Sequence, residues 1–407
     1  MADIPKIRFK GFTEPWEQRK LGDIITEYKE TVDSDCTLPI LTSSKTEGVI
    51  LQEEHFGRKQ QHDITGYNIL PRNYCTYRNR SDGVDFTFNI NKCCDKGIIS
   101  KFYPVFSGKN SDVFFLSLVL NNSEEVVREI AYTCTGTGQK VLSFLDLQKM
   151  KVRVPNFDEQ KEIAAYFESL DHLITLHQRK CDDTKELKKY MLQKMFPKNG
   201  EKFPEIRFKG FTEAWEQRKL EAVLSLLKDG THGTHQDAEE GPYLLSAKNI
   251  KNGQIIIDDS SDRKISEDEF NQIHTKFTLE NGDILLTIVG SIGESAILES
   301  AGKFTFQRSV AFLRPSEEMT SRFLKTEIES VQFQKELNDR KSQSAQPGVY
   351  LGDLSKIPIY ITSKEEQKKI GKYFSHLDNL ITLHQRKCDT LKELKKYMLQ
   401  NMFPKKG

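Results

Sequence analysis

The chain has 407 residues, of which 37% are hydrophobic and 29% are charged, and its formal net charge is +1 at pH 7. This length suffices for two or three domains with their own cores, and the composition is that of an ordinary soluble protein. A net charge so close to zero argues against a protein that holds nucleic acid by bulk charge alone.

Neither a membrane span nor an export signal is expected. The longest apolar run, 113–120, contains a serine and falls short of the roughly 18 residues that a membrane helix needs. The first ten residues, MADIPKIRFK, lack the apolar core of a signal peptide. The seven cysteines include no CxxC pair and indicate reduced thiols, so we expect a cytoplasmic protein.

Each half of the chain opens with the same aromatic segment, which we call the aromatic box. Residues 7–21 read IRFKGFTEPWEQRKL and residues 206–220 read IRFKGFTEAWEQRKL, so the two copies differ at one position. The only two tryptophans, Trp16 and Trp215, hold matching places. We predict that these aromatic residues are buried and pin the segment onto a core; exposed tryptophans that stack on bases are the alternative.

The region that follows each box differs between the halves. These regions, about 22–150 and 221–357, contain β-rich runs separated by turn signals, and each also contains a helical pattern. Strands are expected at 38–42, 85–90, 254–257, 283–289 and 304–313, and helices at 123–132 and 320–338. The sequence therefore predicts two compact heads of mixed α/β (α+β) structure.

A long helix follows each head, and its two copies are nearly identical. Residues 163–198 match residues 370–405 at 28 of 36 positions after a shift of 207. Apolar or near-apolar side chains recur at steps of three and four, which is the pattern of a coiled-coil seam. The expected seam comprises Ile163, Phe167, Leu170, Ile174, His177, Cys181, Thr184, Leu187, Met191 and Met195, and in the copy Ile370, Phe374, Leu377, Ile381, His384, Cys388, Leu391, Leu394, Met398 and Met402.

Start and stop signals bound these helices. Asn156 with Glu159, and Ser363 with Glu366, have the spacing of a capping box, and a proline follows the last seam methionine of each copy. A stripe this narrow needs a partner of the same period, so we expect the helices to form an antiparallel coiled coil about 50 Å long. The predicted division is head 1–155, helix 156–198, head 199–361 and helix 362–407.

The chain ends resemble the junction between the halves, since both pair an MFPK run with an aromatic box. We therefore expect the second helix to end beside the first box, in a pseudo-two-fold molecule with neighbouring termini. Near the seam midpoint His177, Cys181, His384 and Cys388 are expected to form a polar layer that fixes the register. A zinc site made by these four side chains is the alternative.

The repeated motifs resemble those of the specificity (S) subunit of type I restriction-modification systems. The resemblance covers essentially the whole chain. It rests on the paired FKGFTExWEQRKL boxes, the EQKxI helix starts at 159–163 and 366–370, and TGTGQK at 135–140. The second head adds KDGTHGT at 228–234, SAKNIKNG at 246–253 and NGDILLTIVGSIG at 281–293.

This resemblance implies a non-catalytic subunit with two target recognition domains, each of which binds one half of an interrupted DNA sequence. It also implies two modification (methyltransferase) subunits docked on the helices, and restriction subunits in the full complex. No cofactor is expected in this chain, whereas S-adenosylmethionine, Mg and ATP are expected on the partner subunits. Two unlike heads on one spacer also suit a bipartite target with unlike halves.

Residue types that suit bases or phosphates mark the candidate DNA contacts, and solvated polar loops are the alternative. In the first head they include a turn-like segment, three basic residues expected at phosphates, and the end of TGTGQK. The candidates are Tyr77, Arg78, Asn79, Arg80 and Ser81, then Lys45, Arg58 and Lys59, and finally Gln139 and Lys140. The TGTGQK run lacks the spacing of a nucleotide-binding phosphate loop.

The second head offers two polar turns and the residues after an apolar run. Its candidates are Thr231, His232, Gly233, Thr234, Lys248, Asn249, Gln307 and Arg308, together with Gln346, which matches Gln139. His232 and His235 suggest a metal site only weakly, because no carboxylate or thiol accompanies them in sequence.

The predicted function is therefore that of a DNA sequence-specificity subunit without catalytic activity. No methyltransferase NPPY or DPPY motif, glycine-rich cofactor loop, Walker A motif or nuclease carboxylate cluster is found in the sequence. Two other classes stay open. One is an enzyme that methylates or cleaves DNA alone, and the other is a protein-interaction scaffold whose two heads hold unlike protein partners.

Overall fold

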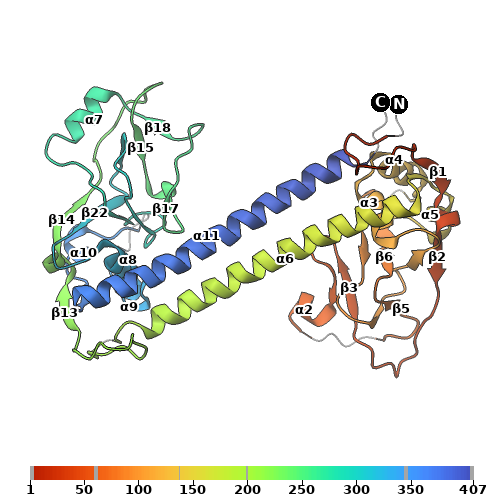
Figure 1. Ribbon diagram of the computed structural model, residues 1–407, viewed down its shortest axis with the longest axis horizontal. Coiled ribbons are helices and arrows are strands. Elements are labelled where there is room, and N and C mark those ends of the chain that lie inside the picture. The colour runs from red at the N-terminus through yellow and green to blue at the C-terminus, as the bar shows by residue number, and fades with distance from the viewer. Residues whose placement is uncertain (1–3, 59–62, 137, 199, 343–346, 404–407) are drawn as a thin grey trace. The chain divides into compact units, whose positions relative to one another are not determined.

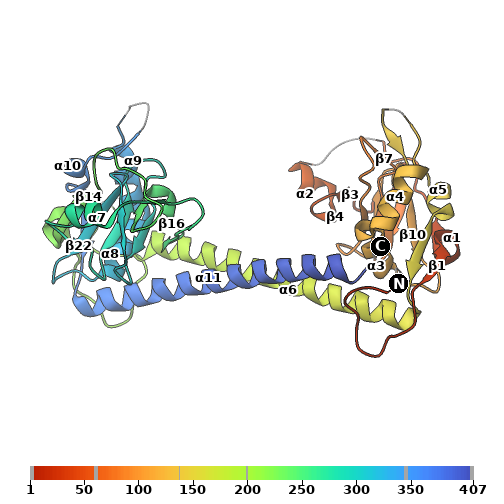
Figure 2. The same ribbon diagram turned by 90° about the horizontal axis from the view of Figure 1, so that it is seen from above.

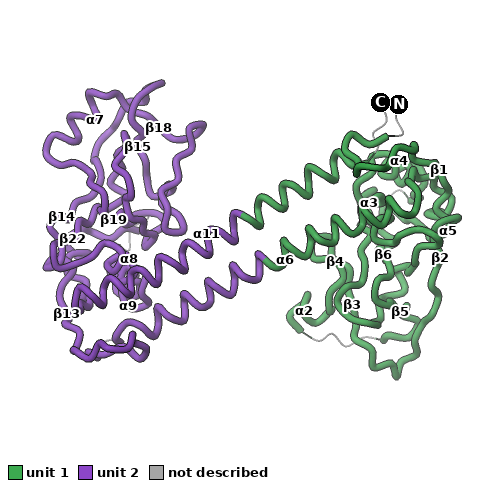
Figure 3. The backbone as a smooth tube through the Cα atoms, viewed as in Figure 1, with its two compact units in different colours: residues 1–176, 387–407 green, residues 177–386 purple. Residues whose placement is uncertain are grey.

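Two compact units make up the structure. The computed structural model describes residues 4–58, 63–136, 138–198, 200–342 and 347–403. Unit 1 comprises Met1–Leu176 and Lys387–Gly407, and unit 2 comprises His177–Arg386 (Figure 3). Each unit therefore holds the beginning of one long helix and the end of the other. Within the described ranges, no helix is both long and apolar enough to cross a membrane.

Unit 1 is organised around a four-stranded sheet in the order β2-β10-β6-β8, and its strand pairs are antiparallel (Figure 1). Its elements are β1 (Glu17–Lys20), α1 (Leu21–Ile24), β2 (Ile25–Tyr28), β3 (Leu41–Ser44), β4 (Gly48–Leu51), α2 (Gln52–Phe56), β5 (Asn68–Pro71), β6 (Cys75–Tyr77), β7 (Arg80–Ser81), β8 (Phe88–Ile90), β9 (Lys96–Ile99), β10 (Val105–Gly108), α3 (Val113–Asn122), α4 (Glu124–Thr133), β11 (Lys140–Val141), α5 (Phe144–Lys149), β12 (Lys151–Val154) and the first part of α6 (Phe157–Lys194).

Unit 2 repeats this sheet as β14-β22-β19-β20 and adds a three-stranded sheet, β18-β15-β21. Its elements are β13 (Glu216–Lys219), η1 (Leu220–Val223), β14 (Leu224–Asp229), β15 (Tyr243–Leu245), η2 (Ala247–Asn249), β16 (Ile250–Lys251), β17 (Gln254–Ile255), β18 (Arg263–Lys264), α7 (Glu267–Ile273), β19 (Ile284–Thr287), β20 (Ser295–Ile297), β21 (Phe304–Phe306), β22 (Val310–Pro315), α8 (Ser321–Glu329), α9 (Val331–Asp339), α10 (Leu351–Leu354), β23 (Pro358–Ile361) and the first part of α11 (Lys364–Asn401). The prediction of mixed α and β heads is confirmed.

Two predicted elements of unit 2 are interrupted. The run 304–313 forms two strands, β21 and β22, because the chain turns at 307–309. The helical pattern 320–338 forms α8 and α9, because Ser330 leaves the helical conformation and its hydroxyl accepts the Phe333 N–H at 3.2 Å. A serine at this place caps a new helix rather than continuing the old one.

Both tryptophans are buried, which confirms the packing prediction and makes the base-stacking alternative wrong. Trp16 is 3% exposed and Trp215 is 2% exposed. In unit 1 the Trp16 ring packs edge-on against Phe115 and Phe403, and in unit 2 the Trp215 ring does so against Phe196. Each box thus packs against a phenylalanine that follows the end of a long helix.

Each box also bonds to a helix end through its backbone. The Ile7 N–H donates to the Asn401 carbonyl at 3.0 Å, and the Ile206 N–H donates to the Lys194 carbonyl at 2.9 Å. The second helix therefore ends beside the first box, as the repeated junction predicted.

The helix starts carry buried ion pairs with the boxes. Asn156 caps α6 by accepting the Glu159 N–H at 3.0 Å, as predicted. The Glu159 carboxylate, which is 0% exposed, does not return to the cap but accepts two bonds from Arg8 at 2.6 Å. In unit 2, Arg207 donates to Glu366 in the same bidentate way, at 2.7 and 2.8 Å. A bidentate arginine–carboxylate pair fixes both position and orientation.

The glutamine that follows each glutamate holds the head in place. Gln160 donates to the Pro155 carbonyl and accepts from the Ser111 hydroxyl and the Asp112 N–H, just before α3. Gln367 makes the matching bonds in unit 2, donating to the Thr362 carbonyl and accepting the N–H of the residue that precedes α8. The paired EQK motif is therefore structural.

Within each unit, α6 and α11 lie antiparallel along the predicted seam (Figures 1 and 2). The burial of most seam residues agrees with the prediction, but Leu187 and Leu394 are 44% and 39% exposed, so their assignment to the seam is wrong. The steps of three and four continue through the next residues instead, Lys188 and Lys395. These lysines bind Asp378 in unit 2 and Asp171 in unit 1, at 2.6 and 2.5 Å.

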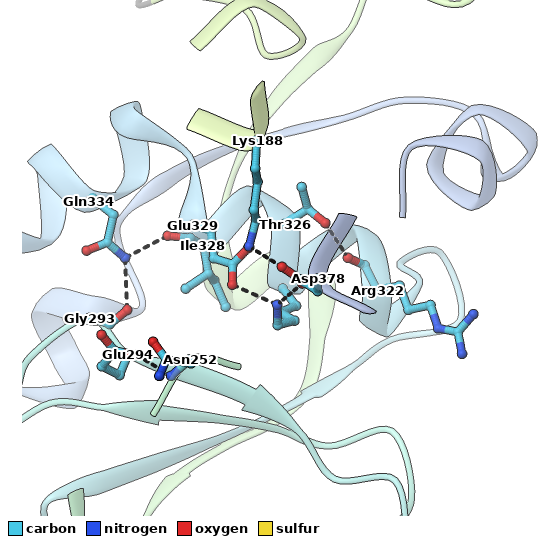
Figure 4. Close-up of polar contacts among 11 residues, drawn as sticks. Lys188, Asn252, Gly293, Glu294, Arg322, Thr326, Ile328, Glu329, Gln334 and Asp378 are labelled. Carbon is cyan, nitrogen blue, oxygen red and sulfur yellow. Dashed lines mark hydrogen bonds and ion pairs between the residues drawn. The ribbon is translucent and has the colours of Figure 1, made fainter. Parts of the chain in front are cut away.

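In unit 2 the seam lysine belongs to a closed ring of four charges (Figure 4). Lys188 binds Glu329 and Asp378 at 2.7 and 2.6 Å, and Lys325 binds the same two carboxylates at 2.7 and 2.8 Å. Burial lowers the pKa of Lys325, but the two carboxylates outweigh it and leave the pKa raised. The ring therefore ties α6, α8 and α11 together.

The polar layer at the seam midpoint is present in unit 2. The Nδ1 atoms of His177 and His384 are 3.0 Å apart, so one ring donates and the other accepts. Cys181 is buried and its thiol donates to the Ile381 carbonyl at 3.8 Å. This contact confirms a polar layer, and the described residues include no group of three or more side chains placed to hold a metal ion.

Candidate nucleic-acid interface

Several connections of unit 1 meet at one edge of its central sheet. The register pairs Tyr28 with Val105, Val105 with Thr76 and Tyr77 with Phe88. The strands β2 and β6 therefore end where β8 and β10 begin. We call the loops that meet there, 78–87, 100–104 and 138–141, the loop edge of unit 1.

Unit 2 has a matching loop edge, formed by 230–235, 288–293 and 307–309. Here β14 and β19 end where β22 begins, because Asp229 pairs with Ala311 and Thr287 pairs with Val310. At Gly230 a Cβ atom would lie 2.2 Å from the Phe306 carbonyl oxygen, so only glycine permits this close approach.

A hollow beside the loop edge of unit 1 brings together three of the predicted basic residues of this head. Lys45, Arg78 and Arg80 line one hollow of about 340 Å³, with Asp82 and Asp85 also in its wall. The Lys45 ammonium pairs with Asp85 at 2.6 Å. Neither arginine forms an ion pair with any described residue. Arg58 is exposed and does not line this hollow, and Lys59 lies outside the described residues.

The predicted contact at Tyr77 is wrong. This side chain is 0% exposed, and its hydroxyl donates to the Leu142 carbonyl at 3.0 Å. Burial raises the pKa of the phenol. Tyr77 is the last residue of β6 and faces the core, so it supports the loop edge from below. The sequence gives no sign that the Tyr77 side chain points inward, because the residue stands beside polar and basic residues.

The TGTGQK segment joins the same edge through β7 and β11. Val141 pairs with Arg80, and Lys140 pairs with Ser81. Gln139 is exposed, whereas Lys140 is half-buried and its ammonium donates to the Gly136 carbonyl at 2.8 Å. Gln139 and Lys140 therefore stay predictions, with the glutamine better exposed.

In unit 2 the loop edge brings together two groups of predicted DNA contacts that are distant in sequence, Thr231–Thr234 and Gln307–Arg308. The Thr231 N–H donates to the Phe306 carbonyl at 2.8 Å, and the Arg308 N–H donates to the Thr231 carbonyl at 3.1 Å. His232, Gly233, Thr234 and Arg308 are exposed. His232 pairs with Asp229, and His235 pairs with Glu269, each at 2.6 Å. Each imidazole thus has a carboxylate of its own.

The predicted contact at Asn249 is also wrong. Asn249 is 3% exposed, accepts the Ser246 N–H at 3.0 Å and donates to Asp262 at 2.7 Å. It closes a capping box that shapes the turn. Lys248 is exposed but pairs with Asp262 at 2.8 Å, so part of its charge is used within the head. Gln346 lies outside the described residues.

Sequence reasoning missed Lys101 and Phe102, which belong to the loop edge of unit 1. Phe102 is 37% exposed, and the Arg80 guanidinium lies over its ring at 4.6 Å from the centroid. The available sequence signal was an aromatic residue between a lysine and the Tyr-Pro turn, KFYP at 101–104.

The described structure thus contains two heads that are built on one repeated frame and have matching loop edges of unlike composition. The chain belongs to the family described as type I restriction modification DNA specificity domain, whose model matches residues 13–184 and 212–393. It is a specificity subunit, a non-catalytic component of such systems.

Named relatives agree with this membership. The type I restriction enzyme MjaVIII specificity subunit of Methanocaldococcus jannaschii is 26% identical over 315 residues, which are 75% of this chain and 73% of the relative. The EcoBI specificity subunit of Escherichia coli is 25% identical over 41% of this chain and 36% of the relative. The crystal structure of a type I S subunit from M. genitalium shares the fold, with a TM-score of 0.63 and 14% identity over 99% of this chain and all of the other.

Proposed function

We propose that the chain binds an interrupted, asymmetric DNA target, one half through each loop edge. The observation that carries this proposal is the repetition of one loop arrangement with different side chains. Unit 1 presents Arg78 and Arg80 at its edge, whereas unit 2 presents Thr231, His232 and Arg308. Arginine, threonine and histidine all suit base edges or phosphates, but not the same ones.

We further propose that two modification subunits dock on the long helices and carry the methyltransferase chemistry with S-adenosylmethionine. Restriction subunits, with ATP and Mg, would join the same complex in the cytoplasm. Support comes from exposed apolar side chains that the repeat provides twice. Leu187 and Tyr190 are 44% and 50% exposed on α6 in unit 2, and Leu394 and Tyr397 are 39% and 56% exposed on α11 in unit 1. Residues three apart share a helix face.

The docking proposal predicts an effect of the double variant Tyr190→Ala, Tyr397→Ala. Tyrosines that become buried when a partner docks are frequent interface hot spots. We therefore expect each substitution to weaken one docking site by about tenfold or more. Native mass spectrometry of the co-expressed complex should show fewer modification subunits per chain. Tyr132→Ala, which removes an 88% exposed tyrosine from α4, is the control and should leave the stoichiometry unchanged. Two bound modification subunits in the double variant would contradict this surface.

The DNA-binding proposal is tested by mapping methylated adenines in a genome with this gene present and deleted. We expect one bipartite motif with unlike halves that disappears on deletion. Purified complex should bind that motif more tightly than a scrambled duplex at the same salt concentration. A complex with modification subunits that shows no sequence preference would favour the protein-interaction scaffold instead.

A further inference from the structure

The backbone that carries Arg80 is held from both sides. The Asn79 N–H donates to the Phe102 carbonyl at 2.9 Å, and the Asn79 carbonyl accepts the Leu142 N–H at 3.0 Å. The next residue, Arg80, pairs with Val141 in the β7–β11 ladder. These hydrogen bonds to two neighbouring loops fix the backbone from which the Arg80 side chain extends. A precise recognition contact requires such a fixed backbone.

The side chain of Arg80 is held as well, without being neutralised. Its guanidinium lies 4.6 Å from the centroid of the Phe102 ring, and Arg80 is exposed. Of the two carboxylates in the hollow, Asp85 is paired with Lys45 at 2.6 Å. Stacking on an aromatic face restricts the plane of a guanidinium but leaves its N–H edge able to donate.

Unit 2 has the same backbone junction with different side chains. The Val349 N–H donates to the Ile288 carbonyl at 2.9 Å, and Val289 bridges to Gly348. The Ile288 N–H donates to the Ser309 carbonyl at 2.9 Å. Val289 therefore takes the place of Arg80, and Ser309 takes the place of Phe102. Neither Val289 nor Ser309 is a cation or an aromatic residue.

We propose that Arg80 is the residue by which unit 1 reads a guanine in its half of the target, and that Phe102 is its positioning residue. The proposal rests on the DNA-binding function proposed above. A guanidinium held over an aromatic ring can donate two parallel hydrogen bonds to O6 and N7 of guanine in the major groove, a pattern that no other base presents. The Val289 side chain has no hydrogen-bond donor, so the matching residue of unit 2 cannot make this contact.

The test uses the full complex with its modification subunits and reads the methylated motif across a genome. Arg80→Ala should relax one guanine position in one half-site, lowering discrimination there by roughly 5- to 150-fold, the range of a bidentate base contact. Arg80→Gln should shift that position toward adenine, which glutamine bonds through N6 and N7. Val289→Ala is the matched control in unit 2 and should leave this position unchanged.

The role of Phe102 is tested by a loss and a rescue. Phe102→Ala should relax the same single position as Arg80→Ala, whereas Phe102→Tyr, which keeps an aromatic face, should retain the guanine. A purely structural role would lower thermal stability or methylation at all sites without changing the motif. Relaxation by Phe102→Ala without rescue by Phe102→Tyr would overturn the positioning role.

Other outcomes would overturn the reading role of Arg80. A guanine retained in Arg80→Gln would do so, even if Arg80→Ala proved too unstable to methylate DNA. Uniformly weaker methylation with an unchanged motif would also do so, because it indicates a phosphate contact. These results would leave the proposed function intact. If the parent complex yielded no bipartite motif, both the function and this inference would be overturned.

Discussion

Glu366→Gln should destabilise the protein by about 3 kcal/mol, since removing one partner of a buried ion pair leaves an uncompensated charge. Glu366 is 0% exposed at the side chain and Arg207 is 13% exposed. Glutamine preserves the shape of the carboxylate but not its charge, so Arg207 would keep its cost of burial and lose its counterion. The measurement is the free energy of unfolding from denaturant titration of the whole chain.

A matched control lies in the same aromatic box. Glu216 also pairs with an arginine, Arg218 at 2.8 Å, but the two side chains are 60% and 32% exposed. Solvent screens such a pair, so Glu216→Gln should change the free energy of unfolding by less than about 1 kcal/mol. Equal effects of the two substitutions would show that burial does not determine the strength of the box-to-helix pairs.

Glu327→Gln should remove a pH dependence of stability between about pH 4.5 and pH 8. Complete burial raises the pKa of Glu327 to about 8, although the Tyr360 N–H donates to its carboxyl at 2.9 Å. In the unfolded chain this group ionises near its ordinary value of 4.5. As pH rises through this window the unfolded state releases the proton and the folded state keeps it, so the free energy of unfolding falls.

The expected fall in stability is on the order of a few kcal/mol across the window, because each pKa unit corresponds to about 1.4 kcal/mol. The readout is the difference between parent and variant at each pH, which cancels the contributions of other groups. Glutamine retains an acceptor for the Tyr360 N–H, so the difference should grow in favour of the variant from pH 4.5 to pH 8. Glu317→Gln, an exposed change, should show no such trend. A flat difference for Glu327→Gln would contradict a neutral buried carboxyl.

The repeated boxes and helices could be predicted from the sequence because each copy supports the interpretation of the other. The heads differ in sequence, so neither could be interpreted by comparison with the other. The near-identical repeats predicted the helix pair and the closure of the second helix on the first box, and the capping-box spacing predicted the caps at Asn156 and Ser363. The seam prediction failed at Leu187, because hydrophobicity suggested leucine where the regular spacing continued through Lys188. A lysine can occupy a seam position when a carboxylate on the facing helix pairs with it, and that partner is distant in sequence.

Two of the candidate contacts, Tyr77 and Asn249, failed for the same physical reason. Tyr77 and Asn249 are polar residues beside basic or glycine-rich segments, so composition placed them on the surface. Their burial depends on bonds to Leu142 and Asp262, which only the folded chain brings near. Glu327 could not be found either, since a glutamate in the helical run 320–338 is ordinarily solvent-exposed.

The strand pairs at the base of each head explain how one frame can carry such different heads. β1 pairs with β12 through Glu17 and Val154, and β13 pairs with β23 through Glu216 and Ile361. The first and last strands of each head therefore pair with each other, so the chain enters and leaves the head at the same place. The entropic cost of closing a flexible segment grows only with the logarithm of its length, so these strand pairs tolerate heads of different length that keep their contacts with the helices. A head with different loops can therefore be joined to the same two helices without a change in the strands that connect them.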